Sequence, residues 1–375
     1  MKQQLALLLS FAIILTTMQG CGPEPNIASG VNNKPKNIIL LIGDGMGLSQ
    51  ISTTYYYQEA PASFSRFKQI GLIRTSSSSH KITDSAAGAT AFSCGTKTYN
   101  AAIGVNADTV PQPTILEMLG NEQGKKTGVI ATSSITHATP ASFYAHVPFR
   151  SMAEQIATFM PTSNIDFFAG GGLKFFNQRV DQANYVDTLK QNGFEVYTEA
   201  LPEATNLKPG KKYGCLLASD GMDPVALGRG SFLPDATSLA LKHLSGTEQG
   251  FFLMVEGSQI DWGGHANDAE YIITEMQDFD QVINLVLDFA EQNPGTLVVV
   301  TADHETGGFS LSGAEKKPVK WKPYRDYNEL NPTFSTGGHT STLIPVFAYG
   351  PGAEQFQGIY ENTGIFDRIK AVSGL

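Results

Sequence analysis

Short apolar runs rich in β-branched residues recur along the chain, and each one ends abruptly in polar residues. The clearest are NIILLIGDG at 37–45, KTGVIATSSITHATP at 126–140, GFFLMVEGSQID at 250–261 and TLVVVTADHET at 296–306. Continuous apolar runs of this length are typical of strands that are buried on both faces of a parallel sheet. We therefore expect these runs to form central strands.

Helical patterns lie between these runs, with apolar residues every three or four positions. They cover TILEMLGNEQ at 114–123, SMAEQIATFM at 151–160, DATSLALKHLS at 235–245 and the long stretch 269–292. The alternation predicts an α/β fold, a three-layer α/β/α sandwich with a mostly parallel central sheet. Ligands of such folds bind outside the carboxyl ends of the strands.

The composition along the chain predicts its domain organisation. No repeat or low-complexity linker occurs after about residue 36, so we expect one catalytic domain over 37–375. The stretch 306–338 carries the richest turn signals, which predicts a small crown-type insertion over the active-site face.

The N-terminus has the order of an export signal. Lys2 precedes the apolar run LALLLSFAII, and MQGC then resembles a lipoprotein cleavage site, although Met18 stands where leucine is usual. We expect a signal peptide at 1–20, lipidation of Cys21 and a polar tether over 21–36. The protein would be exported, as a periplasmic or outer-membrane-anchored lipoprotein that touches the membrane only through its lipid.

The composition limits the classes of partner that the chain can bind. The net charge of −9 argues against a nucleic-acid-binding surface, because phosphate backbones are bound by an excess of Lys and Arg. Bound metal ions can still invert the local charge and allow phosphate esters to bind. Cys94 and Cys215 are too few for a disulfide framework and are expected to be buried thiols.

The loop IGDGMG carries the first candidate ligand. Its glycines resemble a dinucleotide-binding loop, but Leu48 occupies the last glycine position and Asp44 would repel a pyrophosphate. A metal ligand between two glycines fits Asp44 better, while a turn-forming aspartate remains the simpler alternative.

Other polar residues at strand ends strengthen the metal interpretation. Asp261 and His265 are four residues apart and share one face of a helical turn. Each motif is weak alone, since such residues also occur in solvated loops. Together they form a mixed set that suits zinc, with oxygen ligands left for magnesium: Asp44, Glu256, Asp261, Asp303, His265, His304 and His339.

Ser85, in KITDSAAGATAF at 81–92, is the candidate nucleophile. No histidine adjoins it in sequence to take its proton, but a zinc ion could stabilise the alkoxide. The following small residues favour a helix whose first N–H groups would face the same anion. Without the metal ligands, Ser85 would simply be a helix N-cap.

Six motifs together resemble the alkaline phosphatases, in order from residue 37 to about 353. They are NIILLIGDGMG, TDSAAGATAFSCGTKTYNAAIGV, HATPASFYAHVPFR, FFLMVEGSQIDWGGHAN, VTADHETGG and GGHTSTLIPVFAYGPGA. The resemblance implies metal-dependent hydrolysis of phosphate monoesters to an alcohol and inorganic phosphate, which is both product and inhibitor. It also implies a phosphoserine intermediate, two Zn2+ and one Mg2+ per subunit, and a homodimer.

The resemblance implies a role for each matching residue. Ser85 matches the nucleophile and Arg150 the guanidinium that holds two phosphate oxygens. The first zinc would take Asp261, His265 and His339, the second Asp44, Asp303 and His304, and magnesium Asp44, Thr139 and Glu256.

Two positions depart from the enterobacterial pattern and resemble cold-adapted and marine bacterial enzymes. His137 replaces an aspartate near magnesium, which puts the identity and occupancy of the third metal in doubt. Trp262 replaces a lysine near the phosphate, so we expect weaker phosphate binding and faster product release. The alternative is that Trp262 only packs against the insertion.

Other readings fit the motifs less well. A sulfatase needs a C-x-P-x-R motif that CGTKT at Cys94 lacks, and related diesterases usually have a threonine nucleophile. A catalytically silent, phosphate- or metal-binding lipoprotein would lack a ligand or the nucleophile, and this chain has both.

Overall fold

The computed structural model describes residues 34–316 and 324–375, within a compact unit that spans Asn33–Leu375. The predicted signal peptide at 1–20, Cys21 and the tether up to residue 33 lie outside the described residues. Within those described ranges, no helix combines the length and the apolar character needed to cross a membrane.

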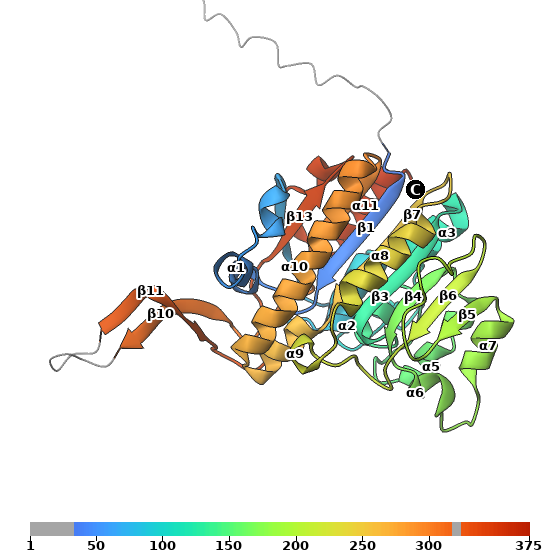
Figure 1. Cartoon of the computed structure of the whole chain (residues 1–375), viewed down its shortest axis with the longest axis horizontal. Coiled ribbons are helices and arrows are strands. Elements are labelled where there is room, and N and C mark those ends of the chain that lie inside the picture. Colours follow the sequence, from blue (N-terminus) through green and yellow to red (C-terminus); the bar gives the residue numbers. More distant parts are fainter. Residues whose placement is uncertain (1–33, 317–323) are drawn as a thin grey trace, which may run out of the picture. The chain divides into compact units, whose positions relative to one another are not determined.

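A ten-stranded sheet forms the middle layer (Figure 1). The four predicted strands stand together at its centre, where β8, β1, β7 and β3 are adjacent and parallel. Their bounds are Thr296–Thr301, Asn37–Gly43, Phe251–Gly257 and Lys126–Ser134. Nearly every residue in them is buried, which confirms the expectation of two covered faces.

Six further strands extend the sheet on both sides of this centre. Beyond β3 follow β4, β6 and β5, all parallel, at Phe167–Gly171, Lys212–Leu216 and Phe194–Tyr197. Beyond β8 follow β13, β2 and β14, at Ile344–Tyr349, Gln69–Arg74 and Gly358–Glu361. Only the pairings of β13 are antiparallel, so the sheet is mostly parallel, as predicted.

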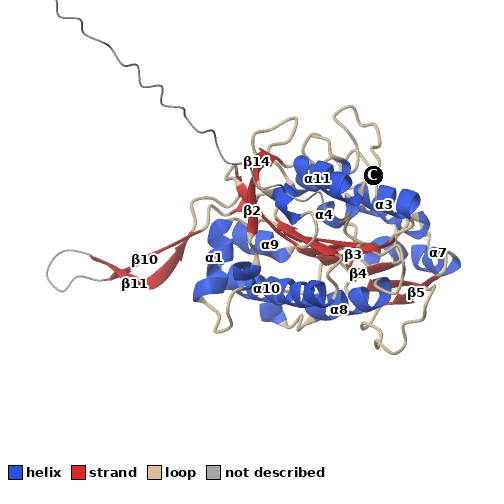
Figure 2. Cartoon of the chain, turned by 90° about the horizontal axis from the view of Figure 1, so that it is seen from above, coloured by secondary structure: helices blue, strands red, loops and turns tan. Residues whose placement is uncertain are grey.

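Helices cover both faces of the sheet. Figure 2 shows α8 (Phe232–Leu244) and α10 (Ala269–Gln292) on one side, and α3 (Ile115–Gln123), α4 (Ala138–Ala141) and α11 (Gly364–Ser373) on the other. The buried residues of α10 follow the helical period, from Ile272 through Met276, Phe279 and Ile283 to Leu287. This apolar stripe explains why α10 packs along the centre of the sheet.

The remaining helices are short and lie around these layers. They are α1 (Leu48–Tyr56), α2 (Ser85–Cys94), α5 (Ala153–Ala157), α6 (Lys174–Asn177), α7 (Tyr185–Gln191) and α9 (Gln259–Ala266). Helix α5 ends before the predicted residue 160, because Pro161 has no N–H to donate to the Ala157 carbonyl, and a 3-10 turn follows at Met160–Thr162.

The segment predicted as an insertion contains a hairpin. Strands β10 (Ser310–Lys316) and β11 (Tyr324–Thr333) pair antiparallel, and Figure 1 shows them projecting away from the sheet, beyond α1. At the base of the hairpin, β9 (Glu305–Thr306) pairs with β12 (His339–Thr340). Thr306 is fully buried and therefore belongs to the framework under the hairpin.

Cys94 and Cys215 are both buried, and neither forms a disulfide, as predicted. Burial raises the pKa of each thiol to about 12, so both stay protonated at neutral pH. Their role is to fill the core.

Candidate active site

The candidate site lies where the central strands end. Ile42 on β1 pairs with Glu256 on β7 and with Thr301 on β8, so the three strands end in register. Asp44 follows directly after β1 and Asp303 two residues after β8, and the three carboxylates therefore meet at one edge of the sheet. This is the edge at which ligands of parallel α/β sheets bind.

Glycine at position 45 lets these loops approach each other. Its backbone has φ = +75°, and a Cβ there would lie only 2.6 Å from Asp261 Cα. The Gly45 N–H donates to Asp303 Oδ1 over 3.2 Å. Gly45 thus allows a close backbone contact between the loops that a residue with a side chain would block.

Asp261, His265 and His339 form the first group of possible metal ligands. Helix α9 carries Asp261 and His265 one turn apart, which confirms the predicted helical spacing. The two Nε2 atoms are 3.1 Å apart, and Asp261 Oδ1 lies 3.4 and 3.6 Å from them. Ligand atoms around a tetrahedral zinc ion are about 3.4 Å apart, so the group fits one ion.

Hydrogen bonds on the far side of both rings fix their tautomers. His265 Nδ1 donates to the Gly337 carbonyl over 2.8 Å, and His339 Nδ1 donates to the Thr83 carbonyl over 2.9 Å. Each Nε2 therefore carries a lone pair, and two lone pairs that face each other cannot hydrogen-bond. A cation between them resolves this repulsion, since ligating histidines typically donate their other N–H to a carbonyl.

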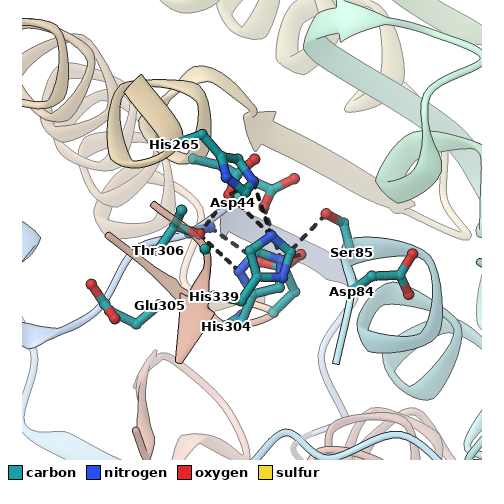
Figure 3. A network of polar contacts seen from close by, with 12 residues as sticks. Asp44, Asp84, Ser85, His265, His304, Glu305, Thr306 and His339 are labelled. Atoms are coloured by element: carbon teal, nitrogen blue, oxygen red, sulfur yellow. Dashed lines mark hydrogen bonds and ion pairs between the residues drawn. The ribbon is translucent and has the colours of Figure 1, made fainter. Parts of the chain in front are cut away.

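Asp44, Asp303 and His304 form the second group, and all three are fully buried. His304 Nε2 lies 3.1 Å from Asp303 Oδ2 and 3.5 Å from Asp44 Oδ1. Burial acts to lower the pKa of His304, but the Asp303 carboxylate outweighs it and raises that pKa. Ser85 Oγ is 3.3 Å from the same Nε2, so the serine borders this group (Figure 3).

The Ser85–His304 contact differs from a serine–histidine–aspartate triad. In a triad the serine and the carboxylate contact opposite nitrogens of the imidazole. Here Ser85 and both carboxylates converge on Nε2, while Nδ1 faces Thr306 Oγ over 3.2 Å. Such convergence is the geometry of a shared cation site.

Asp44, His137 and Glu256 form a third group. Glu256 Oε2 accepts hydrogen bonds from Ser258 and Ser133, over 2.7 and 3.3 Å. Burial nevertheless raises the pKa of Glu256 to about 7. Burial and Arg150 lower the pKa of His137 to about 4, so its imidazole is neutral and offers a single lone pair, either to a cation or to a hydrogen-bond donor. The sequence placed His137 near the third metal, and the structure places it among that metal's possible ligands.

Unpaired buried atoms show that these groups fit divalent cations. Among the described residues, several buried side-chain atoms of the site have no hydrogen-bond partner within the protein: Asp44 Oδ1 and Oδ2, Asp303 Oδ2, Glu256 Oε1, Thr139 Oγ1 and His137 Nδ1. Burial, then the neighbouring carboxylates, raise the pKa of Asp44 well above its usual range. Buried carboxylates in contact are costly unless cations neutralise them.

Ser85 is the first residue of helix α2. Asp84 is the N-cap, and its Oδ1 accepts from the Ala87 N–H over 3.1 Å, so the reading of Ser85 as the cap is wrong. Gly88 brings the helix against the site, because a Cβ there would lie 3.0 Å from Asp303 Cβ. The Ser85 hydroxyl thus faces the cation groups at the positive end of a helix.

Arg150 is held beside Ser85 by two contacts. Its Nη1 donates to Asp84 Oδ2 over 3.0 Å, and its Nη2 donates to His137 Nε2 over 3.1 Å. The side chain is 27% exposed, so the guanidinium can reach a bound anion. Trp262 packs edge-on to His137, with ring centroids 6.2 Å apart, and against Gly221, which lies outside the hairpin.

Several residues that orient the site do not stand out in the sequence. Asp84 bridges helix α2 and Arg150, and Thr306 hydrogen-bonds to both Asp261 and His304. Buried Glu305 accepts hydrogen bonds from Gln50 and Thr340 and so ties β9 to α1 and β12. In the sequence, only their positions next to predicted site residues set them apart, in the segments DSA at 84–86 and DHET at 303–306.

We expect the metal-free protein to lose stability between pH 6.5 and 8. Asp44, Glu256 and His304 have raised pKa values in the folded state, so the folded protein keeps protons that the unfolded chain has released. Such stability is present at low pH and is lost as the pH rises through the folded-state pKa, by about 1.4 kcal/mol per pH unit for each proton. The pKa of His137 is lowered to about 4, so this group changes the stability only below pH 6.5.

Thermal unfolding of chelator-treated protein should therefore have a lower midpoint at pH 8 than at pH 6.5. Divalent cations should remove this trend, because they favour the ionised carboxylates. A midpoint that rises with pH in the metal-free protein would contradict the burial of these groups.

The fold is a mostly parallel α/β sandwich, and it brings carboxylates and histidines together beside a serine at the start of a helix. This combination of fold and site is that of a metal-binding hydrolase. The alkaline phosphatase family model matches residues 35–329. The chain belongs to the alkaline phosphatase family and is a phosphatase, in a family that hydrolyses phosphate monoesters.

Relatives and solved structures agree with this assignment. Alkaline phosphatase 3 of Bacillus subtilis is 36% identical, over 91% of this chain and 89% of its own length. The structure of alkaline phosphatase from the Antarctic bacterium TAB5 is 54% identical, with a TM-score of 0.88 over 91% of this chain and 98% of that chain. A cold-active enzyme from a psychrophilic Shewanella is 31% identical, with a TM-score of 0.79 over 90% and 99%.

Proposed function

We propose that this chain hydrolyses phosphate monoesters through a phosphoserine at Ser85. The observation that carries the proposal is the position of Ser85 Oγ, 3.3 Å from His304 Nε2, where Asp44 and Asp303 also converge. A nucleophile at this point borders two cation groups and the N-terminus of α2. All three features favour the ionised serine and an incoming phosphate dianion.

The proposed cofactors are two Zn2+ and one Mg2+. The first zinc would be held by Asp261, His265 and His339, the second by Asp44, Asp303 and His304, and magnesium by Asp44, Thr139 and Glu256. When bound, these ions would stabilise the negative charge that develops on the attacking and leaving oxygens. Mixed carboxylate and histidine ligands suit zinc, and the oxygen ligands of Asp44, Thr139 and Glu256 suit magnesium.

The third site is where this chain departs from the enterobacterial pattern. A variant of the TAB5 enzyme in which aspartate replaces a histidine has been solved with Mg bound in its M3 site. In this chain, His137 lies with Asp44 and Glu256 and also accepts a hydrogen bond from Arg150. We propose that His137 lets the third site influence how Arg150 is held.

The chain's own residues would carry the reaction in two displacements. Ser85 Oγ attacks the phosphorus atom and the alcohol leaves with the serine proton. Water then attacks the phosphorus of the phosphoserine, the bond from phosphorus to Ser85 Oγ breaks, and inorganic phosphate leaves while Ser85 regains a proton from the water. Arg150 would bind two non-bridging oxygens through its fork of N–H groups, while Asp84 fixes its orientation. The side chain of His265 is 44% exposed, which leaves this side of the site accessible to water and substrate.

The cellular setting is proposed on sequence grounds. Export, lipidation at Cys21 and an anchor in the membrane are supported by the N-terminal motif, and homodimer formation by family resemblance. The acidic net charge continues to argue against a nucleic-acid partner.

Matched substrates test the proposed activity. We expect kcat/KM for an aryl phosphate monoester to exceed that for the matching diester by at least about a hundredfold, because the diester lacks an anionic oxygen that the site would bind. The aryl sulfate should be a similarly poor substrate, since it also carries less negative charge. Equal rates on the monoester and the diester would overturn the assignment to monoesters.

A further inference from the structure

Thr306 lies between the two histidine-containing groups (Figure 3). Its hydroxyl donates to Asp261 Oδ1 in the first group, and the same oxygen is 3.2 Å from His304 Nδ1 in the second. A carboxylate can only accept, so the Thr306 O–H is committed to Asp261. The Thr306 oxygen must therefore accept from the His304 Nδ1–H.

This chain of hydrogen bonds sets one atom in each group. His304 with a proton on Nδ1 carries its lone pair on Nε2, the atom that faces Ser85 and the buried carboxylates. Asp261 Oδ1 is the oxygen that lies between His265 and His339. The Thr306 hydroxyl thus orients His304 Nε2 in the second group and Asp261 Oδ1 in the first group.

The rest of Thr306 is confined, so its hydroxyl has a fixed position. The residue is fully buried, its N–H donates to the Gly45 carbonyl over 3.2 Å, and its carbonyl accepts from Gln50 Nε2 over 2.9 Å. A Cβ on Gly264 would lie 2.8 Å from Thr306 Cβ, which shows how closely α9 packs against it. Thr306 also pairs with His339 in the β9–β12 ladder.

We propose that Thr306 is a positioning residue that couples the two zinc sites, so that loss of its hydroxyl weakens both sites together. The proposal rests on the two zinc ions of the proposed function. Thr306 acts through Asp261 and His304, and its effect is to hold the ligands ready before the ions arrive. Hydrogen-bond partners of metal ligands typically change metal affinity by 10- to 100-fold.

Stepwise titration of the metal-stripped full-length chain with Zn2+, in competition with a chelator of known affinity, tests this coupling. In Thr306→Val, both zinc dissociation constants should rise about 10- to 100-fold, while Thr306→Ser, which keeps the hydroxyl, should bind like the wild type. Thr301→Val is the matched control, because Thr301 is equally buried but donates to the Pro345 carbonyl and not to a ligand. It should leave both constants within about threefold of the wild type, far below the effect typical of a ligand's hydrogen-bond partner.

A spectroscopic readout separates positioning from general loss of stability. In zinc-loaded protein with 15N-labelled histidine, the Nδ1–H proton of His304 should exchange slowly with solvent in the wild type and in Thr306→Ser, and faster in Thr306→Val, which offers no oxygen to accept it. Thr306→Ala serves as a second variant if valine is too bulky beside Gly264.

The outcomes distinguish this proposal from the proposed function. A wild type that binds two zinc ions, with only one or neither constant changed in Thr306→Val and Thr306→Ala, overturns the coupling alone. A wild type that binds fewer than two zinc ions overturns the proposed metal content and the coupling with it. If both variants fail to fold while Thr301→Val folds, Thr306 has a structural role and the coupling is wrong.

Discussion

Ser85→Ala is expected to lower kcat for a phosphate monoester by about 10³- to 10⁶-fold, the range seen when other covalent hydrolases lose their nucleophile. The loss should be chemical and not structural. Asp84 caps helix α2, and alanine is the better helix former, so removal of the Ser85 hydroxyl leaves the cap intact. Zinc content and thermal unfolding should therefore stay close to the wild type.

Ser93→Ala is the matched control for this variant. Ser93 is buried on the same helix, but its hydroxyl faces the Thr90 carbonyl instead of the cation groups. The Ser93→Ala variant should retain nearly full activity.

Acid trapping with a labelled monoester should place the phosphate on Ser85 in the wild type. Recovery of the label on another residue would refute the proposed nucleophile.

Removal of divalent cations is expected to reduce activity to the level of Ser85→Ala. Within residues 34–316 and 324–375, the Ser85 hydroxyl contacts no possible base other than His304, whose Nε2 also faces Asp44 and Asp303. Zn2+ together with Mg2+ should restore the rate, and Mg2+ alone should not, because the histidine-containing groups suit zinc. Full turnover in a protein shown to be free of divalent metal would end this mechanism.

The same treatment should lower the stability of the fold. A ligand that binds only the native state stabilises it by about 4 kcal/mol when present at 1,000 times its dissociation constant. Chelation also leaves Asp44 and Asp303 buried beside each other without a neutralising ion. The midpoint of thermal unfolding should fall on chelation and recover when the metals are returned.

The sequence predicted the centre of the fold because local pattern and tertiary role agree there. The stretches 38–43 and 297–300 are apolar throughout, and a strand that is covered on both faces needs such a sequence. Pattern was less informative where one residue overrides it, as Pro161 does after α5. The hairpin was expected as loop because its alternating residues are largely exposed and carry no apolar face.

The residues of the site also differ in how well the sequence predicts them. Asp261 and His265 could be paired in advance because their spacing is local to one helical turn. The contact of Thr306 with Asp261 depends on how β9 packs against α9, and no local pattern encodes that packing. The hydrogen-bond directions that set each histidine tautomer likewise exist only after distant segments meet, as between His339 and Thr83.

The spread of the ligands along the chain bears on how the enzyme matures. Asp44 follows the first strand of the sheet, whereas His339 comes after the hairpin, close to the last strands. A growing chain can therefore not complete the first group, which needs His339, until nearly all of the domain has been made. Binding of an ion by that group would then be a late step in maturation, after the central strands have been synthesised.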